Sequence, residues 1–206
     1  MGKRQALAEY HRGSILAVAE RLFTEKGVDG TTMDDIAREA EYSKATLYVY
    51  FQSKEEIVGA ILLNGMAMLK KRLRQAVDSA PGDWRADYHA VCRAIAGFYE
   101  ENPAACDAVM GFGAVGDAEP GSTKELRHMS GEIFKVLADF LAAGVRAGDI
   151  QMDDVMETVM LFWAAISGMV HTAASGAEAL PKQVGKTRAE FLEDGFELLL
   201  RAISKR

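Results

Sequence analysis

The sequence has few of the features that typify disulfide-bonded, metal-binding or membrane-spanning proteins. Its two cysteines, Cys92 and Cys106, form neither a CxxC pair nor a longer framework, which fits reduced thiols packed as small hydrophobes. The longest nearly apolar run, residues 159–170, is well short of the ~20 residues that span a bilayer. The charged N-terminus is not followed by the apolar segment of a signal peptide. We therefore expect a soluble, cytoplasmic protein.

The chain also lacks the surplus of positive charge with which proteins wrap nucleic acid. Its net charge is −6. Residues 1–54 carry eight basic and eight acidic side chains, whereas residues 55–206 carry 16 basic and 22 acidic ones. Because neutralisation of phosphates supplies most non-specific affinity, any contact with DNA is expected to be local.

Sustained two-residue alternation is missing as well, so no strand is predicted. Apolar residues recur at spacings of three and four, which predicts an all-α protein of about nine helices. With 49% hydrophobic residues among 206, the chain can build a large core. The predicted helices span residues 8–26, 33–40, 44–51, 54–79, 84–101, 103–110, 122–148, 153–174 and 186–204.

The most informative segment is residues 31–57, TTMDDIAREAEYSKATLYVYFQSKEEI, which predicts two short capped helices and the start of a third. Thr32 followed by Asp35 has the spacing of a capping box, and Ser43 and Ser53 are placed to cap the next two helices. About three residues separate the first two helices, so these helices must cross steeply. This arrangement is typical of a helix-turn-helix that binds DNA.

These residues also carry a family resemblance. The LFTEKG ending of the first predicted helix, followed by TTMDDIAREA, YSKATLYVYF and SKEEI, closely resembles the DNA-binding domain of the TetR family of bacterial transcriptional repressors over about residues 12–60. Beyond them the similarity lies in helix number and length and in a GDI..DD sequence at residues 148–154.

The resemblance implies a helix-turn-helix domain at residues 1–54 and an effector-binding and dimerisation domain at residues 55–206. It further implies a homodimer, a palindromic operator in double-stranded DNA and a small-molecule effector that binds the C-terminal domain. We expect a transcriptional repressor that a small hydrophobic effector releases from DNA, with no cofactor, no bound metal, no membrane partner and no catalytic activity.

The resemblance makes residues 44–51 the recognition helix, and the chemistry of these residues agrees. Lysine reaches guanine acceptors, threonine bonds a base edge or a phosphate, and alanine meets a thymine methyl. Helix N-termini and tyrosine hydroxyls suit phosphates. Tyr50 is as well explained by burial in the core, and Lys54 by solvation at a helix start. The predicted DNA contacts are Thr32, Tyr42, Ser43, Lys44, Ala45, Thr46, Tyr48, Tyr50 and Lys54.

Two positions depart from the family's pattern. Glu41 stands where the family usually has glycine, so it either adopts a positive φ, at a cost of about 1 kcal/mol, or the turn is built differently. Val49 stands where a polar or aromatic phosphate contact is common, and it removes a donor. The N-terminal residues Lys3, Arg4 and Arg12 either reach DNA or are solvated and disordered.

The predicted helix 153–174 is apolar nearly all round, and helix 186–204 has a wide apolar arc. Such helices must be covered on both sides. The simplest solution packs one side against the chain's own core and the other against a symmetry mate, in an isologous four-helix interface. The predicted interface residues are Val159, Ile166, Val170, Phe191, Gly195, Leu198, Leu199 and Ala202.

Large, adaptable side chains between residues 66 and 171 predict a pocket for a hydrophobic or aromatic effector, although each is also explained as plain core. His171 and His128 are the candidate polar anchors. The predicted lining is Met66, Tyr88, Cys92, Tyr99, Met110, Phe112, Met129, Phe134, Phe162, Trp163, Met169 and His171.

Two other classes of function have weaker support. His89 and Cys92 are spaced to begin a metal site on one helix, but no third and fourth ligand is spaced to complete it. A basic run on the helix 54–79 predicts a solvated face, or else a protein-binding surface on a module that keeps the helix-turn-helix as scaffold. Its residues are Lys70, Lys71, Arg72 and Arg74.

Overall fold

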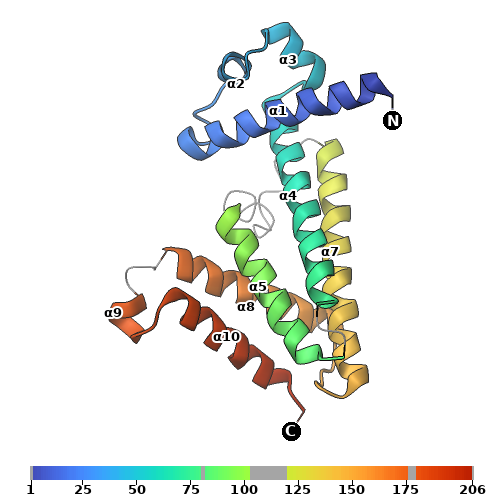
Figure 1. The fold of residues 1–206 in the computed structure, drawn as a ribbon, viewed down its shortest axis with the longest axis vertical. Coiled ribbons are helices and arrows are strands. Elements are labelled where there is room, and N and C mark those ends of the chain that lie inside the picture. The colour runs from blue at the N-terminus through green and yellow to red at the C-terminus, as the bar shows by residue number, and fades with distance from the viewer. Residues whose placement is uncertain (1, 80–81, 103–119, 176–179, 206) are drawn as a thin grey trace. The chain divides into compact units, whose positions relative to one another are not determined.

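The computed structural model describes residues 2–79, 82–102, 120–175 and 180–205, and within them the chain is all-α (Figure 1). No strand forms in these residues; one isolated bridge pairs Ile150 with Ser204. The predicted all-α class is confirmed. The helices are α1 (Lys3–Lys26), α2 (Met33–Glu39), α3 (Lys44–Tyr50), α4 (Lys54–Val77), α5 (Trp84–Glu101), α7 (Pro120–Ala147), α8 (Val155–Ser175), α9 (Leu180–Val184) and α10 (Arg188–Ile203).

Most predicted helices lie within two or three residues of their observed bounds. The exceptions are the start of α1 and the short helix α9. Helix α1 begins at Lys3, so the N-terminal residues extend a helix and are not a disordered arm. The five-residue α9 was not predicted. Gly27 and Gly148 both adopt the positive φ expected of glycines that end a helix. The predicted helix 103–110 lies outside the described residues.

The chain divides into two compact units. The described part of the first, here called the reader unit, comprises residues 2–65 and 120–127. That of the second, the body unit, comprises residues 66–79, 82–102, 128–175 and 180–205. Helix α4 contributes residues to both units. The domain boundary at residue 54 stays a prediction, since α4 starts there and runs on without a break.

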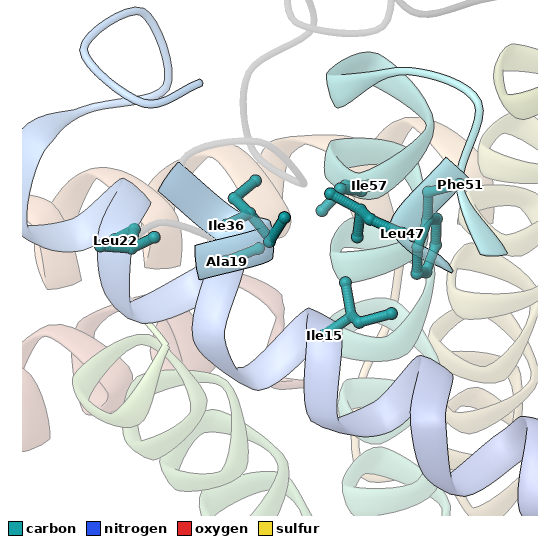
Figure 2. Packing of buried hydrophobic residues seen from close by; sticks show 8 residues of the cluster. Ile15, Ala19, Leu22, Ile36, Leu47, Phe51 and Ile57 are labelled. Atoms are coloured by element: carbon teal, nitrogen blue, oxygen red, sulfur yellow. The ribbon is translucent and has the colours of Figure 1, made fainter. Parts of the chain in front are cut away.

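The core of the reader unit is one small cluster of apolar side chains from α1, α2, α3 and α4 (Figure 2). Phe51, directly after α3, is fully buried, and the guanidinium of Arg12 lies 4.1 Å from its ring centroid. Arg12 also donates to the carbonyl oxygen of Tyr50 at 2.5 Å. Arg12 therefore holds the end of α3 against α1. The buried cluster is Ile15, Ala19, Leu22, Ile36, Ala37, Leu47, Phe51 and Ile57.

In the body unit, α8 packs against both α5 and α10. Trp84, the first residue of α5, stacks on Phe140 of α7 with ring centroids 5.0 Å apart and donates its indole N–H to the Phe140 carbonyl at 3.1 Å. Gly144 makes this approach possible, because a Cβ added there would overlap the indole ring. Gly144, one turn after Phe140 on α7, therefore leaves the room in which the indole ring at the start of α5 packs.

Candidate DNA-binding surface and effector cavity

The N-terminal caps of the helix-turn-helix are formed as predicted. The N–H of Asp35 donates to the Thr32 hydroxyl oxygen at 3.1 Å, and the N–H of Thr32 donates to the Asp35 carboxylate, also at 3.1 Å. The Thr32 hydroxyl also donates to the Asp35 carboxylate at 2.6 Å. This bond, followed by the one from the Thr32 N–H, lowers the pKa of Asp35 to about 2. Ser43 accepts the N–H of Thr46 at 3.1 Å, and Ser53 accepts that of Glu56 at 3.1 Å. The three caps fix where α2, α3 and α4 begin.

The turn between α2 and α3 contains a non-glycine residue with positive φ. Glu41 has a φ of 60°, and within the described residues every other positive φ belongs to a glycine. The first of the two alternatives for Glu41 is therefore confirmed. Its N–H still reaches the Arg38 carbonyl at 3.2 Å, and the N–H of Tyr42 reaches that of Ala37 at 2.9 Å. Hydrogen bonds thus offset a conformation that costs about 1 kcal/mol.

Helix α3 presents Lys44, Ala45, Tyr48 and Val49 to solvent, with Val49 at 75% exposed. The ammonium of Lys44 lies 2.8 Å and 3.1 Å from the two carboxylate oxygens of Asp34 on α2. This hydrogen bond is the main reason why the pKa of Lys44 is raised. Asp34 was not among the predicted contacts, because a spacing of ten residues across a turn matches no helical repeat.

Other predicted DNA contacts make interactions within the reader unit. The hydroxyl of Tyr42 lies 2.6 Å from Nδ1 of His11, and Tyr50 packs half-buried against the reader core. Lys54 donates to the carbonyl oxygens of Val28 at 2.7 Å and Thr31 at 3.1 Å. These residues position α1, α3 and the connection before α2. Their phosphate contacts remain predictions.

An apolar cavity of about 30 Å³ lies in the body unit between α5, α7 and α8. Such a volume holds roughly one water molecule, whereas pockets for drug-sized ligands measure about 300–1,000 Å³. Four of the predicted effector residues line it, namely Tyr88, Cys92, Phe162 and Trp163. The remaining lining residues are Val91, Ile95, Leu137, Phe140, Leu141, Val159 and Ile166.

The cavity wall has almost no polar character. The Tyr88 hydroxyl donates to the Phe196 carbonyl of α10 at 2.9 Å, so it is already engaged. Burial raises the pKa of the Cys92 thiol to about 12, so it stays protonated at neutral pH. The wall therefore suits an uncharged, apolar molecule.

The other predicted effector residues that the structure describes are not among the residues that line this cavity, and their part in effector binding stays a prediction. Buried Tyr99 places its hydroxyl 3.0 Å from Nδ1 of exposed His171. Met169 packs against Gly195, where an added Cβ would overlap its sulfur. Phe134 meets Trp163 edge to face, with centroids 5.7 Å apart. Also outside the lining are buried Met66, half-buried Met129 and exposed His128; Met110 and Phe112 lie outside the described residues.

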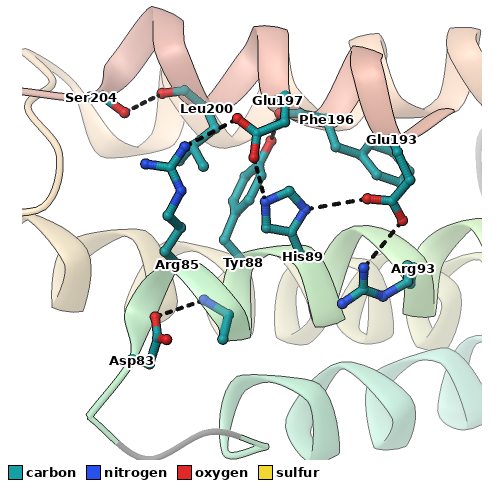
Figure 3. A network of polar contacts seen from close by, with 11 residues as sticks. Asp83, Arg85, Tyr88, His89, Arg93, Glu193, Phe196, Glu197, Leu200 and Ser204 are labelled. Carbon is teal, nitrogen blue, oxygen red and sulfur yellow. Dashed lines mark hydrogen bonds and ion pairs between the residues drawn. The ribbon is translucent and has the colours of Figure 1, made fainter. Parts of the chain in front are cut away.

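A ladder of charged groups joins α5 to α10 (Figure 3). His89 lies between two glutamates, 3.5 Å from Glu193 and 2.9 Å from Glu197. Arg85 pairs with Glu197 at 3.1 Å, and Arg93 pairs with Glu193 at 3.1 Å. His89 is therefore part of an interhelical network. Across the residues that the structure describes, no group of three or more His, Cys, Asp or Glu side chains is arranged to hold a metal.

The structure corrects three of the predicted interface residues. Val159, Ile166 and Val170 are 1%, 3% and 0% exposed, so they belong to the chain's own core. The large apolar side chains exposed on the two helices are Met156, Met160 and Leu161 on α8 and Leu198 on α10. Phe191, Gly195 and Leu199 are half-buried, and Ala202 is exposed.

Helix α8 is long and apolar enough, by length and composition alone, to cross a membrane over residues Val155–Ala174. The longest nearly apolar run within it, residues 159–170, is shorter than the ~20 residues that span a bilayer. Only 28% of the most apolar window is buried inside the chain. Much of the surface of this apolar helix is therefore left uncovered by the described part of the chain.

Two family models match the chain. The model for bacterial regulatory proteins of the tetR family matches residues 15–61, and the model for the tetracyclin repressor-like C-terminal domain matches residues 88–198. The first match contains the helix-turn-helix, and the second contains all the residues that line the cavity.

Individual proteins agree with these models. The HTH-type transcriptional regulator Rv1816 of Mycobacterium tuberculosis is 27% identical over 156 residues, which cover 75% of this chain and 65% of that protein. The chain thus spans slightly less than two thirds of this curated relative's length.

Solved structures share the fold. A protein of unknown function from Rhodococcus sp. RHA1 superposes with a TM-score of 0.78 at 22% identity, covering 95% of each chain. The transcriptional regulator FadR from Bacillus subtilis, in complex with stearoyl-CoA, gives a TM-score of 0.72 at 16% identity over 91% of this chain and 96% of that one. Because the C-terminal model alone matches more than half of the sequence, the chain belongs to the TetR family of bacterial transcriptional regulators.

Proposed function

We propose that the protein is a ligand-responsive transcriptional repressor of the cytoplasm that binds a palindromic operator as a homodimer. The observation that carries this proposal is the exposed face of α3, where Lys44, Ala45 and Tyr48 project from a helix fixed at its start by the Ser43 cap. Side chains of these types can reach guanine acceptors, thymine methyls and phosphates in a major groove.

Replacing both Lys44 and Tyr48 with alanine tests the reading surface. The double variant is expected to lose at least tenfold in affinity for the operator, which is first selected from a random duplex library with the wild-type protein. The matched control is the double variant Tyr10→Ala and Lys26→Ala, which removes the same two side-chain types from exposed positions on α1. Wild-type affinity in the Lys44/Tyr48 variant would show that α3 is not the reader.

The dimer is supported by the uncovered apolar surface of α8. Met156 and Met160 are 48% and 47% exposed and lie one turn apart, and Leu198 of α10 is 68% exposed. A helix with apolar residues on its outer face needs a partner, and a two-fold axis supplies one with the same surface. In a dimer of this kind the two readers would contact half-sites ~34–36 Å apart on one duplex.

A charge placed on this surface tests the dimer. The double variant Met160→Glu and Leu198→Glu is expected to sediment as a monomer and to lose operator binding while keeping its helical content. Glutamates at exposed Lys124 and Lys135 serve as the charge-changing control. A Met160/Leu198 variant that remains dimeric would place the interface elsewhere.

The effector is proposed to be an uncharged hydrophobic molecule that expands the cavity between α5, α7 and α8. FadR of Bacillus subtilis, with stearoyl-CoA, shows that a protein of this fold binds a ligand with a long apolar chain. Adding one methylene with Val91→Ile is expected to fill part of the cavity and to reduce the thermal stabilisation that apolar aromatic compounds produce. An unchanged stabilisation would place their site outside the cavity.

Two states of the dimer would account for regulation. The part of α4 in the body unit is tied to α7 by Lys70–Glu132 at 2.8 Å and to α5 by the ion pair of Arg72 with Glu101. Since α4 also carries residues of the reader unit, ligand that displaces α5 or α7 would change the tilt of α4 and the spacing of the readers. Coupling energies of this kind are typically ~1–3 kcal/mol, and a nearly complete switch needs ~5.5 kcal/mol.

A further inference from the structure

The cationic side chains of the helix-turn-helix are largely occupied within the reader unit. Arg21 pairs with Glu39 at 2.6 Å, Arg38 pairs with Asp35 at 2.5 Å, and Lys44 pairs with Asp34 at 2.8 Å. Arg12 and Lys54 donate to backbone carbonyls, as described above. Phosphates of arbitrary DNA must therefore compete with carboxylates that are already in place.

The pair of Asp34 and Lys44 differs from the others in its position. Both side chains are 61% exposed, and Lys44 lies in the first turn of the proposed recognition helix. Exposed ion pairs contribute little to folding stability and exchange partners readily. Asp34 is not required for the cap of α2, which is made by Thr32 and Asp35. Lys44 and Asp34 can therefore turn their polar groups from each other to the edges of bases.

The geometry of the pair matches base pairs that present an acceptor and then a donor in the major groove, which are G·C and, through thymine O4 and adenine N6, T·A. In the major groove, guanine O6 accepts hydrogen bonds and the neighbouring N4 amino group of cytosine donates them. These two atoms are hydrogen-bonded to each other, so they lie about 2.9 Å apart. The Lys44 ammonium and an Asp34 oxygen lie 2.8 Å apart, with the donor and acceptor order reversed. The ammonium can therefore face O6 while the carboxylate faces N4.

We propose that Asp34 is a specificity-determining residue of the reader, which acts with Lys44 to select base pairs that present an acceptor and a donor in the order of G·C or T·A, and to reject other DNA. On a G·C or T·A pair both side chains gain partners. On a C·G or A·T pair, where the order is reversed, or along the phosphate backbone, the carboxylate meets an acceptor or a negative charge and opposes binding. The proposal rests on the assignment of α3 as the DNA reader and adds a second helix to the readout.

The test compares the wild-type protein with Asp34→Asn in selection from a random 30 bp duplex library, followed by salt titration. Asp34→Asn is expected to lose about tenfold of the preference for G·C or T·A over C·G and A·T at one position of each half-site. Its affinity for random duplex is expected to rise, with a salt dependence steeper by about one phosphate contact, because Lys44 is released. Asp34→Ala, an exposed helical alanine, repeats the test with a side chain that can neither accept nor donate.

Glu55→Gln is the matched control, since Glu55 is an exposed acidic residue at the same second position of α4 that Asp34 holds in α2. It removes one negative charge but should leave both the consensus and the salt dependence as in the wild type. If both Asp34 variants keep the wild-type consensus and salt dependence while the wild type binds a defined operator, the role of Asp34 is refuted and the DNA reader stands. If the wild-type protein selects no consensus, both proposals are refuted.

Discussion

The two compact units use charged side chains in different ways. In the reader unit, the pairs Arg38–Asp35, Lys44–Asp34 and Arg21–Glu39 join residues three, ten and 18 positions apart and lie at the surface. In the body unit, the ladder of Arg85, His89 and Arg93 with two glutamates joins helices about 100 residues apart in sequence. Local pairs shape a surface that another molecule can contact, whereas distant pairs hold helices around a cavity.

The cores of the two units also differ in how they are packed. The apolar cluster of the reader unit gathers side chains from four short stretches around Phe51. The body unit contains a cavity among α5, α7 and α8, whose residues have room to rearrange. A surface that must match DNA benefits from a rigid support, and a site that must admit a ligand benefits from incomplete packing.

The largest expected effects come from a matched pair of core phenylalanines. Phe51 in the reader unit and Phe98 in the body unit are both 0% exposed, and each lies beside an arginine, Arg12 or Arg72. Truncation to alanine should cost about 3–5 kcal/mol in either unit. Phe51→Ala should unfold the reader unit first and abolish DNA binding, while Phe98→Ala should lower the stability of the body unit.

Thermal unfolding followed by circular dichroism, with DNA binding in parallel, distinguishes the two variants. If both variants show a single transition whose midpoint is lowered equally, the two units unfold together and do not differ in stability.

A smaller effect is expected at Gly144, which leaves room for the indole ring of Trp84. Gly144→Ala would push its Cβ into the indole ring, and such overpacking typically costs about 1–3 kcal/mol. Gly131, on an exposed face of the same helix, has open space around it, and Gly131→Ala should stabilise α7 by about 0.5–1 kcal/mol. Chemical denaturation measures both, and equal effects would show that Trp84 adapts without cost.

Thr32→Ala removes the N-cap of α2 and should lower the free energy of unfolding of the reader unit by about 1 kcal/mol. The lowered pKa of Asp35 predicts how this depends on pH: its stabilising contribution is present above the ordinary value of 3.8 and is lost as the pH falls towards 2. The variant should therefore differ from wild type most at neutral pH and least near pH 2. Thr24→Ala, within the last turns of α1, should show no such dependence.

The smallest effect is expected from the ladder between α5 and α10. Glu197→Gln weakens the contacts with Arg85 and His89, which lie near the surface, so the loss should be about 0.5–1 kcal/mol. A double-mutant cycle with Arg85→Ala measures the coupling directly. A coupling energy of zero would show that the ion pair of Arg85 with Glu197 does not contribute to stability.

Local chemistry made much of the reader unit predictable. The caps at Thr32, Ser43 and Ser53 depend on residues three positions apart, so the sequence alone specifies their partners. The family pattern singled out Glu41 but left open whether it adopts a positive φ or the turn is built differently, and the structure has the positive φ. The pair of Asp34 and Lys44 escaped prediction, because its partners approach only after α2 and α3 have packed.

The body unit was predicted in outline but not in its contacts. Apolar spacing placed α5, α7 and α8 correctly, but it does not say which neighbour covers each face. Val159, Ile166 and Val170 were assigned to the dimer interface for that reason, although the chain buries them itself. The same ambiguity applies to Met169 and Gly195, which meet each other where α8 packs against α10.

The stacking of Trp84 on Phe140 gives the protein a built-in optical reporter. The sequence has two tryptophans; Trp163 lines the cavity, and Trp84 stacks on another lining residue. Both therefore belong to the body unit, and the reader contributes no indole emission. Changes in intrinsic fluorescence would report on ligand entering the cavity, so binding can be followed without a label on the DNA-reading surface.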